Sequence, residues 1–305
     1  MKNCRVVYLL PVGPGGDDYI DTLESVMMWA DPSRQIVLLD DRGSVGDELR
    51  RAGVDASDIR VVSARAAPSG QRGGLWWKVA GAIERALAEF RFEMLVRLDT
   101  DALLLGSGLE DVAAERFRAD PTLGTLGGFR VRSDGSLRDF AGAGRDLRRE
   151  AGLLGRMLGR PAATLSELLA LADAAGYEDG EHVIACVQIW RHAALAAFAK
   201  SGWLARDDLA RSRCSDDFIF GAMVRAHGFH SGDFGGPGQP LAVSWRGLPA
   251  DPEELLARGT LATHSVRSWA GRSEAENRAV FAAHRERAGP AFGRPGVSAR
   301  PPEGR

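Results

Sequence analysis

Two aspartates separated by one residue stand between hydrophobic runs near the middle of the chain. The segment Met94–Leu105 reads MLVRLDTDALLL, so Asp99 and Asp101 interrupt an otherwise apolar sequence. Aspartate disfavours strands and is rarely buried without a partner. On an extended backbone, residues i and i+2 point to the same face, so both carboxylates would converge on one point. A hard divalent cation such as Mg²⁺ or Mn²⁺ would relieve their repulsion.

The alternative for this pair is a turn at a strand end, in which one aspartate caps the backbone and the other is solvated. Arg97 shares a face with Asp99, and an Arg–Asp pair there would set the first carboxylate in place. The two interpretations differ in whether both carboxylates meet at one point.

The elements around this pair alternate between apolar runs and helical patterns. Strands are expected over three early segments: Arg5–Val12, Gln35–Leu39 and Ile59–Ser63. We expect Met94–Leu105 to form one further strand. This alternation predicts an α/β fold with a mostly parallel, Rossmann-like sheet flanked by helices.

The composition is that of an ordinary globular protein. The chain has 305 residues, 45% of them hydrophobic and 26% charged, with a formal net charge of −2. This balance provides no broad electrostatic surface for nucleic acid. No apolar stretch approaches the roughly 20 residues of a membrane span. The three cysteines have neither zinc-ligand spacing nor a disulfide framework, so we expect a soluble cytoplasmic protein without an integral membrane segment.

Two further features near the N-terminus point to a ligand. The Gly-Pro loop after the first strand lies where ligands gather in parallel sheets, but it lacks the G-x-G-x-x-G order of a dinucleotide site. Lys78 is expected in the first turn of a helix over Leu75–Phe90, where it and free N–H groups would hold an anion such as a diphosphate. A solvated lysine is the alternative.

Acidic or imidazole side chains recur at the carboxyl ends of strands or at helix starts, in the order Asp40-Asp41, Asp99-Thr100-Asp101, Asp216-Asp217 and His264. Between Cys4 and Trp269, the order of these motifs resembles that of GT-A fold glycosyltransferases of the family 2 type, which use nucleotide sugars. The resemblance implies a catalytic domain over 1–288, with a helical insertion at about 133–180 and an acceptor-side half at about 181–270. The Gly-, Pro- and Arg-rich tail, 289–305, is expected to be disordered and dispensable.

The resemblance also implies a reaction. A sugar would pass from a nucleotide-diphosphate donor, expected to be a UDP-sugar, to a hydroxyl of a small-molecule or glycan acceptor, with Mn²⁺ or Mg²⁺ as cofactor. Asp101 and His264 would be metal ligands, with Asp99 near the ribose or the metal. The other donor-binding residues would be Pro11, Val12, Gly13, Asp40 or Asp41, Lys78, Thr100 and Arg267.

The catalytic base is less well defined by this resemblance. Asp217 matches the acid that acts as base in inverting members, with Asp216 beside it. The family commonly has Glu-Asp where this chain has Asp-Asp, so the choice between the two stays open. One alternative is that Ser215 or Asp216 only caps the N-terminus of a helix. Another is that His264 is a structural histidine and binds no metal.

Two other functions compete with this one. A haloacid-dehalogenase-like phosphatase also places Asp-X-Asp after an apolar strand, but it calls for Thr or Val where this chain has Leu103. A non-catalytic protein that binds sugar nucleotides is the second alternative. The acid cluster disfavours it, because such a protein has no need of desolvated acids.

Overall fold

The computed structural model describes residues 1–14, 18–68 and 72–289. Gly15 and Gly16 of the N-terminal loop lie outside the described residues, as does the tail after Gly289.

A seven-stranded sheet forms the centre of the molecule, with strand order β10-β8-β9-β6-β2-β3-β4. Its strands are β2 (Val6–Val12), β3 (Gln35–Asp40), β4 (Ile59–Ser63), β6 (Met94–Leu98), β8 (Leu123–Gly127), β9 (Val187–Arg191) and β10 (His230–Asp233). β9 runs antiparallel to both of its neighbours, whereas every other pairing in this sheet is parallel. The predicted mostly parallel α/β sheet is therefore confirmed.

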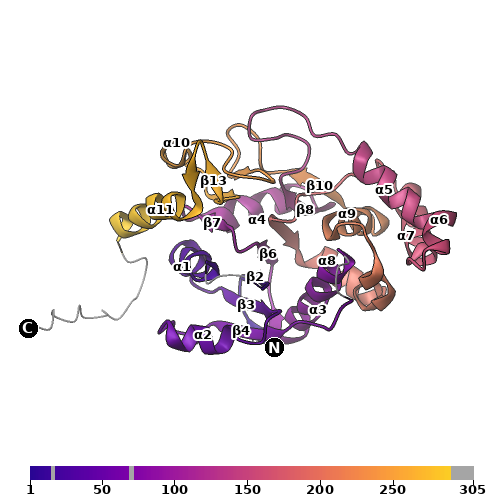
Figure 1. The fold of residues 1–305 in the computed structure, drawn as a ribbon, viewed down its shortest axis with the longest axis horizontal. Helices are drawn as coiled ribbons and strands as arrows, with labels where there is room; N and C mark the ends of the chain where they lie inside the picture. The colour runs from indigo at the N-terminus through magenta and orange to yellow at the C-terminus, as the bar shows by residue number, and fades with distance from the viewer. Residues whose placement is uncertain (15–17, 69–71, 290–305) are drawn as a thin grey trace, which may run out of the picture.

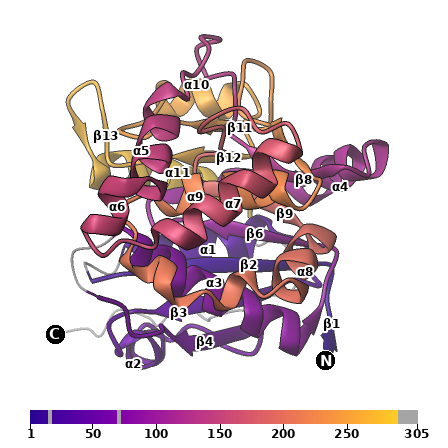
Figure 2. The same ribbon diagram turned by 90° about the vertical axis from the view of Figure 1, so that its right-hand side faces the viewer.

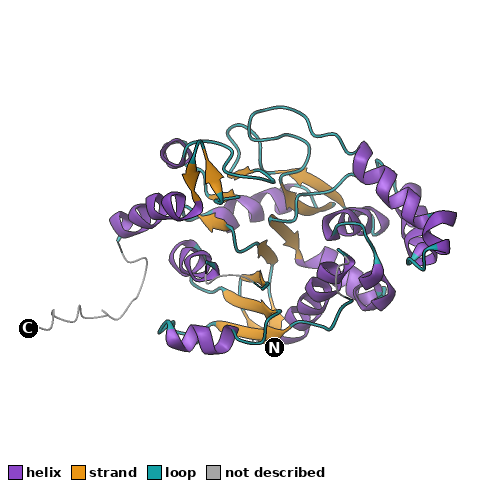
Figure 3. Cartoon of the chain, in the orientation of Figure 1, coloured by secondary structure: helices purple, strands orange, loops and turns teal. Residues whose placement is uncertain are grey.

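Helices cover both faces of this sheet (Figures 1 and 3). Along β2, Tyr8 and Leu10 point into one hydrophobic cluster, and Val7 and Leu9 into the other. The first cluster contains apolar side chains of α1 (Tyr19–Trp29), α2 (Val45–Arg51) and α4 (Leu109–Ala119). The second contains those of α3 (Gly73–Glu89), α8 (His192–Lys200) and α9 (Asp216–Ala226). Burial on both sides explains why these strands read as nearly continuous apolar runs.

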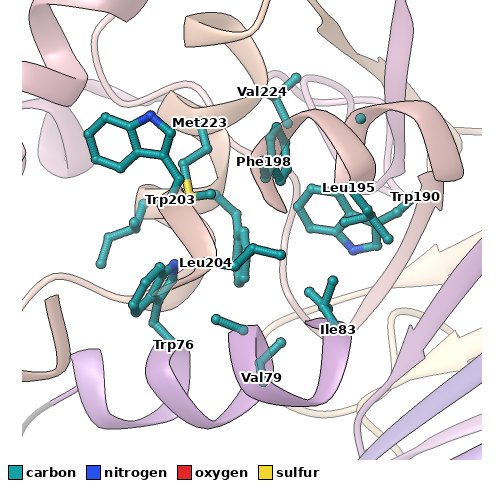
Figure 4. Close-up of a cluster of buried hydrophobic side chains, with 14 of the residues drawn as sticks. Trp76, Val79, Ile83, Trp190, Leu195, Phe198, Trp203, Leu204, Met223 and Val224 are labelled. Atoms are coloured by element: carbon teal, nitrogen blue, oxygen red, sulfur yellow. The ribbon is translucent and has the colours of Figure 1, made fainter. Parts of the chain in front are cut away.

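Large aromatic side chains fill the space between α3 and the helices packed beside it (Figure 4). Trp76 of α3 lies 6.2 Å from Phe220 of α9, and Trp190 of β9 lies 5.1 Å from the same ring, measured between centroids. All three are buried. Such aromatic contacts add to the stability gained by burying these side chains. They also fix α9, which begins at Asp216, against the sheet.

Three helices between β8 and β9 in the chain lie beside α9 (Figures 1 and 2). They are α5 (Ala141–Ala151), α6 (Leu153–Met157) and α7 (Ala162–Ala174). Pro161 occupies the N-cap position of α7 and separates it from α6, because proline is tolerated at a helix start but not within a helix.

The single strand predicted over Met94–Leu105 is wrong. β6 ends at Leu98, and Ala102–Leu104 forms β7, which belongs to a separate three-stranded sheet of order β11-β12-β7. The intervening residues form a turn in which the Ala102 N–H donates to the Asp99 carbonyl at 2.9 Å. The two aspartates therefore occupy a turn between two sheets and not an extended strand.

The remaining elements include the other two strands of the three-stranded sheet and two small two-stranded sheets, β1-β5 and β13-β14. They are β1 (Lys2–Asn3), β5 (Phe90–Arg91), the 3-10 turns Trp203–Ala205 and Asp207–Arg211, β11 (Leu241–Val243), α10 (Pro252–Ala257), β12 (Ala262–His264), β13 (Ser268–Trp269), β14 (Arg272–Ser273) and α11 (Glu274–Ala288). Within the described ranges, none of the helices combines the length and apolar character that crossing a bilayer requires.

Candidate active site

The turn that carries the two aspartates is fixed by three other parts of the chain. The Asp99 N–H donates to the Cys186 carbonyl at 2.9 Å. The Thr100 carbonyl accepts from Thr22 Oγ1 of α1 at 2.7 Å and from the Arg278 guanidinium of α11 at 2.9 Å. Arg278 is buried, and its role was not foreseen because it lies far along the chain from the motif. These bonds leave the two carboxylates free to point toward one another.

Asp99, Asp101 and His264 come together at this turn. One ligand atom from each lies within 4.8 Å of the others, and the described part of the chain contains no other such cluster. Ligand atoms at that spacing can share one ion, since oxygen and nitrogen ligands lie roughly 2.0–2.6 Å from a divalent cation. The predicted convergence of these residues is present, although a turn produces it.

His264 is oriented as a metal ligand would be. Its Nδ1 lies 2.6 Å from the Ser244 carbonyl oxygen, which can only accept, so Nδ1 carries a proton. Nε2 faces Asp101 Oδ1 at 3.1 Å. A metal ion held between Nε2 and the carboxylates would take the place of the Nε2 proton, and a backbone carbonyl behind a ligating histidine is the usual support.

Asp101 is the most heavily bonded member of this cluster. Its Oδ2 accepts from Ser265 Oγ at 2.7 Å and lies 2.9 Å from Arg267 Nε. Burial acts to raise the pKa of Asp101, but His264, Ser265 and Arg267 together hold that pKa below its ordinary value. Burial likewise acts to lower the pKa of His264, yet Cys186 and Asp101 raise it to about 11. The cluster thus holds an anionic carboxylate beside a cation, in the place that a metal ion would take.

A cleft of about 210 Å³ opens beside this cluster at the carboxyl ends of the central strands. It is lined by most of the residues predicted to bind the donor or the metal, namely Pro11, Val12, Gly13, Asp41, Lys78, Asp99, Thr100, Asp101 and Arg267, together with Leu39 and Leu75. Five separate stretches of the chain meet here, as expected at the carboxyl edge of a parallel sheet.

Two details of this cleft differ from the prediction. The Asp40 carboxylate is buried and accepts backbone N–H bonds from Arg42, Gly43 and Val45 at 2.7–3.2 Å, so it holds its own loop and does not line the cleft. Lys78 lies in the second turn of α3, not the first, because the helix begins at Gly73. Its Nζ pairs with Asp41 Oδ2 at 2.6 Å.

Arg97 connects the cluster to the second acidic pair. This arginine of β6 is buried; its Nε lies 3.3 Å from Asp99 Oδ1, and its Nη1 bonds to Asp216 Oδ2. The Arg97–Asp99 pair expected from the sequence is present. Asp216 is likewise buried, so it serves to neutralise Arg97, and the Ser215 side chain does not cap α9.

Asp217 lies in a different environment from Asp216. Burial and the charge of Asp216 raise its pKa to about 6. His182 Nε2 lies 3.6 Å from Asp217 Oδ2 but also 2.6 Å from the Arg138 guanidinium, while His182 Nδ1 lies 2.6 Å from the Gly180 carbonyl. Nδ1 therefore carries the proton and Nε2 accepts from Arg138. Burial and Arg138 lower the pKa of His182 to about 3, so this ring is neutral and forms no ion pair with Asp217.

Replacing Arg97 with methionine should destabilise the protein strongly. The substitution leaves Asp99 and Asp216 without their shared cation, and removing one partner of a buried ion pair costs about 3–5 kcal/mol. Urea denaturation would measure this loss. Arg60→Met is the matched control, because the Arg60–Glu89 pair is exposed and such pairs contribute about 1 kcal/mol or less. Equal midpoints for the two variants would contradict the role given to Arg97.

No protein-family model matches this chain, and no curated protein matches it. Solved structures resemble it at low identity. One is a glycosyltransferase involved in glycosylation of the major capsid of PBCV-1, with 11% identity, 92% of this chain and 99% of the other covered, and a TM-score of 0.44. Another is the galactosyltransferase LgtC in complex with donor and acceptor sugar analogues, with 13% identity, 92% and 95% coverage, and a TM-score of 0.47.

A third is a mannosyltransferase from Pyrobaculum calidifontis in complex with GDP-mannose and Mn²⁺, with 17% identity, 65% and 46% coverage, and a TM-score of 0.35. At this level of similarity, the function of this chain has to be inferred from the residues of its own cleft.

Proposed function

We propose that this protein is a metal-dependent glycosyltransferase that moves a sugar from a nucleotide-diphosphate donor to an acceptor hydroxyl. The observation that carries the proposal is the Asp99–Asp101–His264 cluster, which lies in a cleft at the carboxyl ends of the central strands with Lys78 and Arg267 on its walls. Two carboxylates and an imidazole form a set of metal ligands that suits Mn²⁺ or Mg²⁺ bound together with phosphate oxygens.

The cations around the cleft suit a diphosphate leaving group. Breaking a sugar–phosphate bond develops negative charge on the diphosphate, which preorganised cations stabilise. When bound, the metal ion would supply Lewis-acid stabilisation of that charge. Arg267 is exposed beside Asp101, and Lys78 lines the same cleft, where its pairing with Asp41 can be exchanged for a phosphate oxygen.

The nucleoside would lie against the Pro11–Gly13 segment and Asp41. The Asp41 carboxylate can accept a hydrogen bond from a base N–H or a ribose hydroxyl once Lys78 turns to the phosphates. Asp40 is not given this role because its carboxylate holds its own loop and does not line the cleft. A UDP-sugar is the donor that we would test first, with a small-molecule or glycan acceptor.

Asp217 is the proposed catalytic base. An acceptor hydroxyl must lose its proton as it attacks, and a carboxylate whose pKa lies near the working pH does this efficiently. Asp217 has such a pKa and carries no buried ion pair, whereas Asp216 is committed to Arg97. Asp216 is therefore a positioning residue in this proposal.

A panel of nucleotide sugars with Mn²⁺ or Mg²⁺, scored for slow donor hydrolysis, tests the proposed function. We expect hydrolysis of at least one nucleotide sugar that stops when the metal is chelated. Hydrolysis of simple phosphate monoesters without a preference for the nucleoside would instead identify a haloacid-dehalogenase-like phosphatase. Nucleotide binding with no turnover in any combination would identify a non-catalytic binding protein.

The rate of donor hydrolysis should depend on the protonation of Asp217. Its raised pKa of about 6 means that the carboxylate is protonated, and inactive as a base, below that pH. We expect kcat/KM to rise about tenfold per pH unit up to about pH 6 and then to level off. The residual activity of Asp217→Asn should lack this rise. A wild-type profile that is flat across this range would remove Asp217 as the base.

A further inference from the structure

The helix α6 presents an unusual surface for a globular protein. Leu153, Leu154, Met157 and Leu158 are 72%, 41%, 75% and 61% exposed, respectively. Residues spaced by three or four positions share one side of a helix, so these four side chains form one apolar face. Contiguous exposed apolar side chains on a soluble domain usually mark a contact surface.

The opposite side of α6 is held tightly to the rest of the protein. Gly155 is buried, and a Cβ at this position would lie 1.7 Å from the Glu150 carbonyl oxygen, so only glycine permits this approach. α6 also lies at the outer rim of the molecule, away from α1 and α11 (Figures 1 and 2). Its apolar face is thus turned outward by a close-packed joint with α5.

Exposed arginines outnumber exposed acids on the two helices that form this joint, where Asp146 is the exposed acid. Arg145, Arg149 and Arg156 are exposed, and within the described residues none of them forms an ion pair with an acid. Arg211 and Arg213 are exposed on the adjoining segment, which meets α5 where the Glu150 carboxylate accepts the Arg213 N–H at 3.0 Å. The overall net charge of −2 conceals this local excess of positive charge.

We propose that the α5–α6 elbow, defined as residues 145–160, is a contact for an anionic membrane surface. Leucine and methionine side chains would enter the boundary between headgroups and acyl chains, and the arginines would meet lipid phosphates. A symmetric contact with a second copy would place the arginines of the elbow against themselves, which like-charge repulsion disfavours. A nucleic acid could contact the arginines, but it would leave the apolar side chains of α6 exposed to water.

This contact would be tied to the proposed active site by a short segment. Glu150, near the end of α5, accepts N–H bonds from Arg213 and Cys214, and Asp216 and Asp217 follow directly. The membrane contact itself does not depend on the proposed function. Its test uses neither nucleotide nor metal, so its failure would leave the donor site unaffected.

Flotation with lipid vesicles tests the proposal. The full chain should bind vesicles of phosphatidylcholine and phosphatidylglycerol mixed two to one, bind pure phosphatidylcholine far less, and dissociate when salt is added. The double variant L153E/M157E should lose this binding and keep its melting temperature, because both side chains are exposed. Replacing Arg149 and Arg156 with glutamine should weaken binding by about 30-fold, at roughly 1 kcal/mol per arginine near the surface.

Trp245→Glu is the matched control. Trp245 is 71% exposed but lies in the loop after β11, so its loss should leave vesicle binding unchanged. The proposal is overturned if the wild-type chain ignores anionic vesicles, or if L153E/M157E binds them as the wild type does. It is also overturned if light scattering shows a wild-type dimer that this double variant converts to a monomer.

Discussion

Replacing Asp101 with asparagine should abolish both metal-dependent nucleotide binding and sugar transfer while the fold remains intact. Asp101 contributes the negative charge that faces His264 Nε2 at 3.1 Å, and asparagine removes that charge without changing the shape of the side chain. The Ser265 hydroxyl can still donate to the remaining side-chain oxygen, so the turn should keep its shape, although loss of the buried charge beside His264 should lower the melting temperature. Calorimetric titration with Mn²⁺ and UDP, together with the donor-hydrolysis assay, measures the effect.

Asp47→Asn serves as the control for this variant. Asp47 is an exposed aspartate on α2 outside the cleft, and its loss should change neither binding nor turnover. If Asp101→Asn turned over donor at the wild-type rate in the presence of a chelator, the metal would have no place in the mechanism.

Replacing Asp217 with asparagine should lower turnover by about 10²–10⁴-fold, the usual contribution of a general base. Nucleotide affinity should be nearly unchanged, because Asp217 does not line the donor cleft. The melting temperature should also change little, since Asp217 has no buried ion pair to lose. Single-turnover measurements at saturating donor would separate the chemical step from binding.

Asp216→Asn provides the matched comparison. It removes one of the two carboxylates bonded to Arg97, so its main effect should be a lower melting temperature. A rate loss that is larger in Asp216→Asn than in Asp217→Asn, without loss of folded protein, would move the base by one residue. Normal turnover in both variants would rule out an inverting base at this position.

The sequence predicted the centre of the sheet well because β2 and β3 are buried on both faces and read as apolar runs. The limits of these two strands, and of the more exposed edge strand β4, were found within one residue of their ends in the structure. Periodicity failed at Met94–Leu105, where an apolar run continues from one sheet into another. Only the pairing of Ala102–Leu104 with Ala262–His264 makes β7 a separate strand, and that contact lies some 160 residues away along the chain.

The candidate site was predictable where its residue types are rare at such positions. Asp99 and Asp101 were found because two acids between apolar runs need a reason, whereas His264 was proposed from the resemblance to GT-A fold glycosyltransferases. The roles of Arg278, Arg138 and His182 depend on tertiary contacts with segments remote in sequence, so no local pattern revealed them. Asp40 bonds to its own loop and Asp41 faces Lys78, and this difference in their roles likewise depends on which way the loop turns after β3.

The most direct test of the central claim is the melting temperature of the protein with UDP, measured with Mn²⁺ and again in excess chelator. Ligand at a hundred times its dissociation constant stabilises the native state by roughly 2.7 kcal/mol, which corresponds to a rise on the order of 5 °C. We predict this rise only when the metal is present, a smaller rise in His264→Ala, and none in Asp101→Asn. A rise that persists in excess chelator, or that inorganic phosphate reproduces in full, would contradict the account.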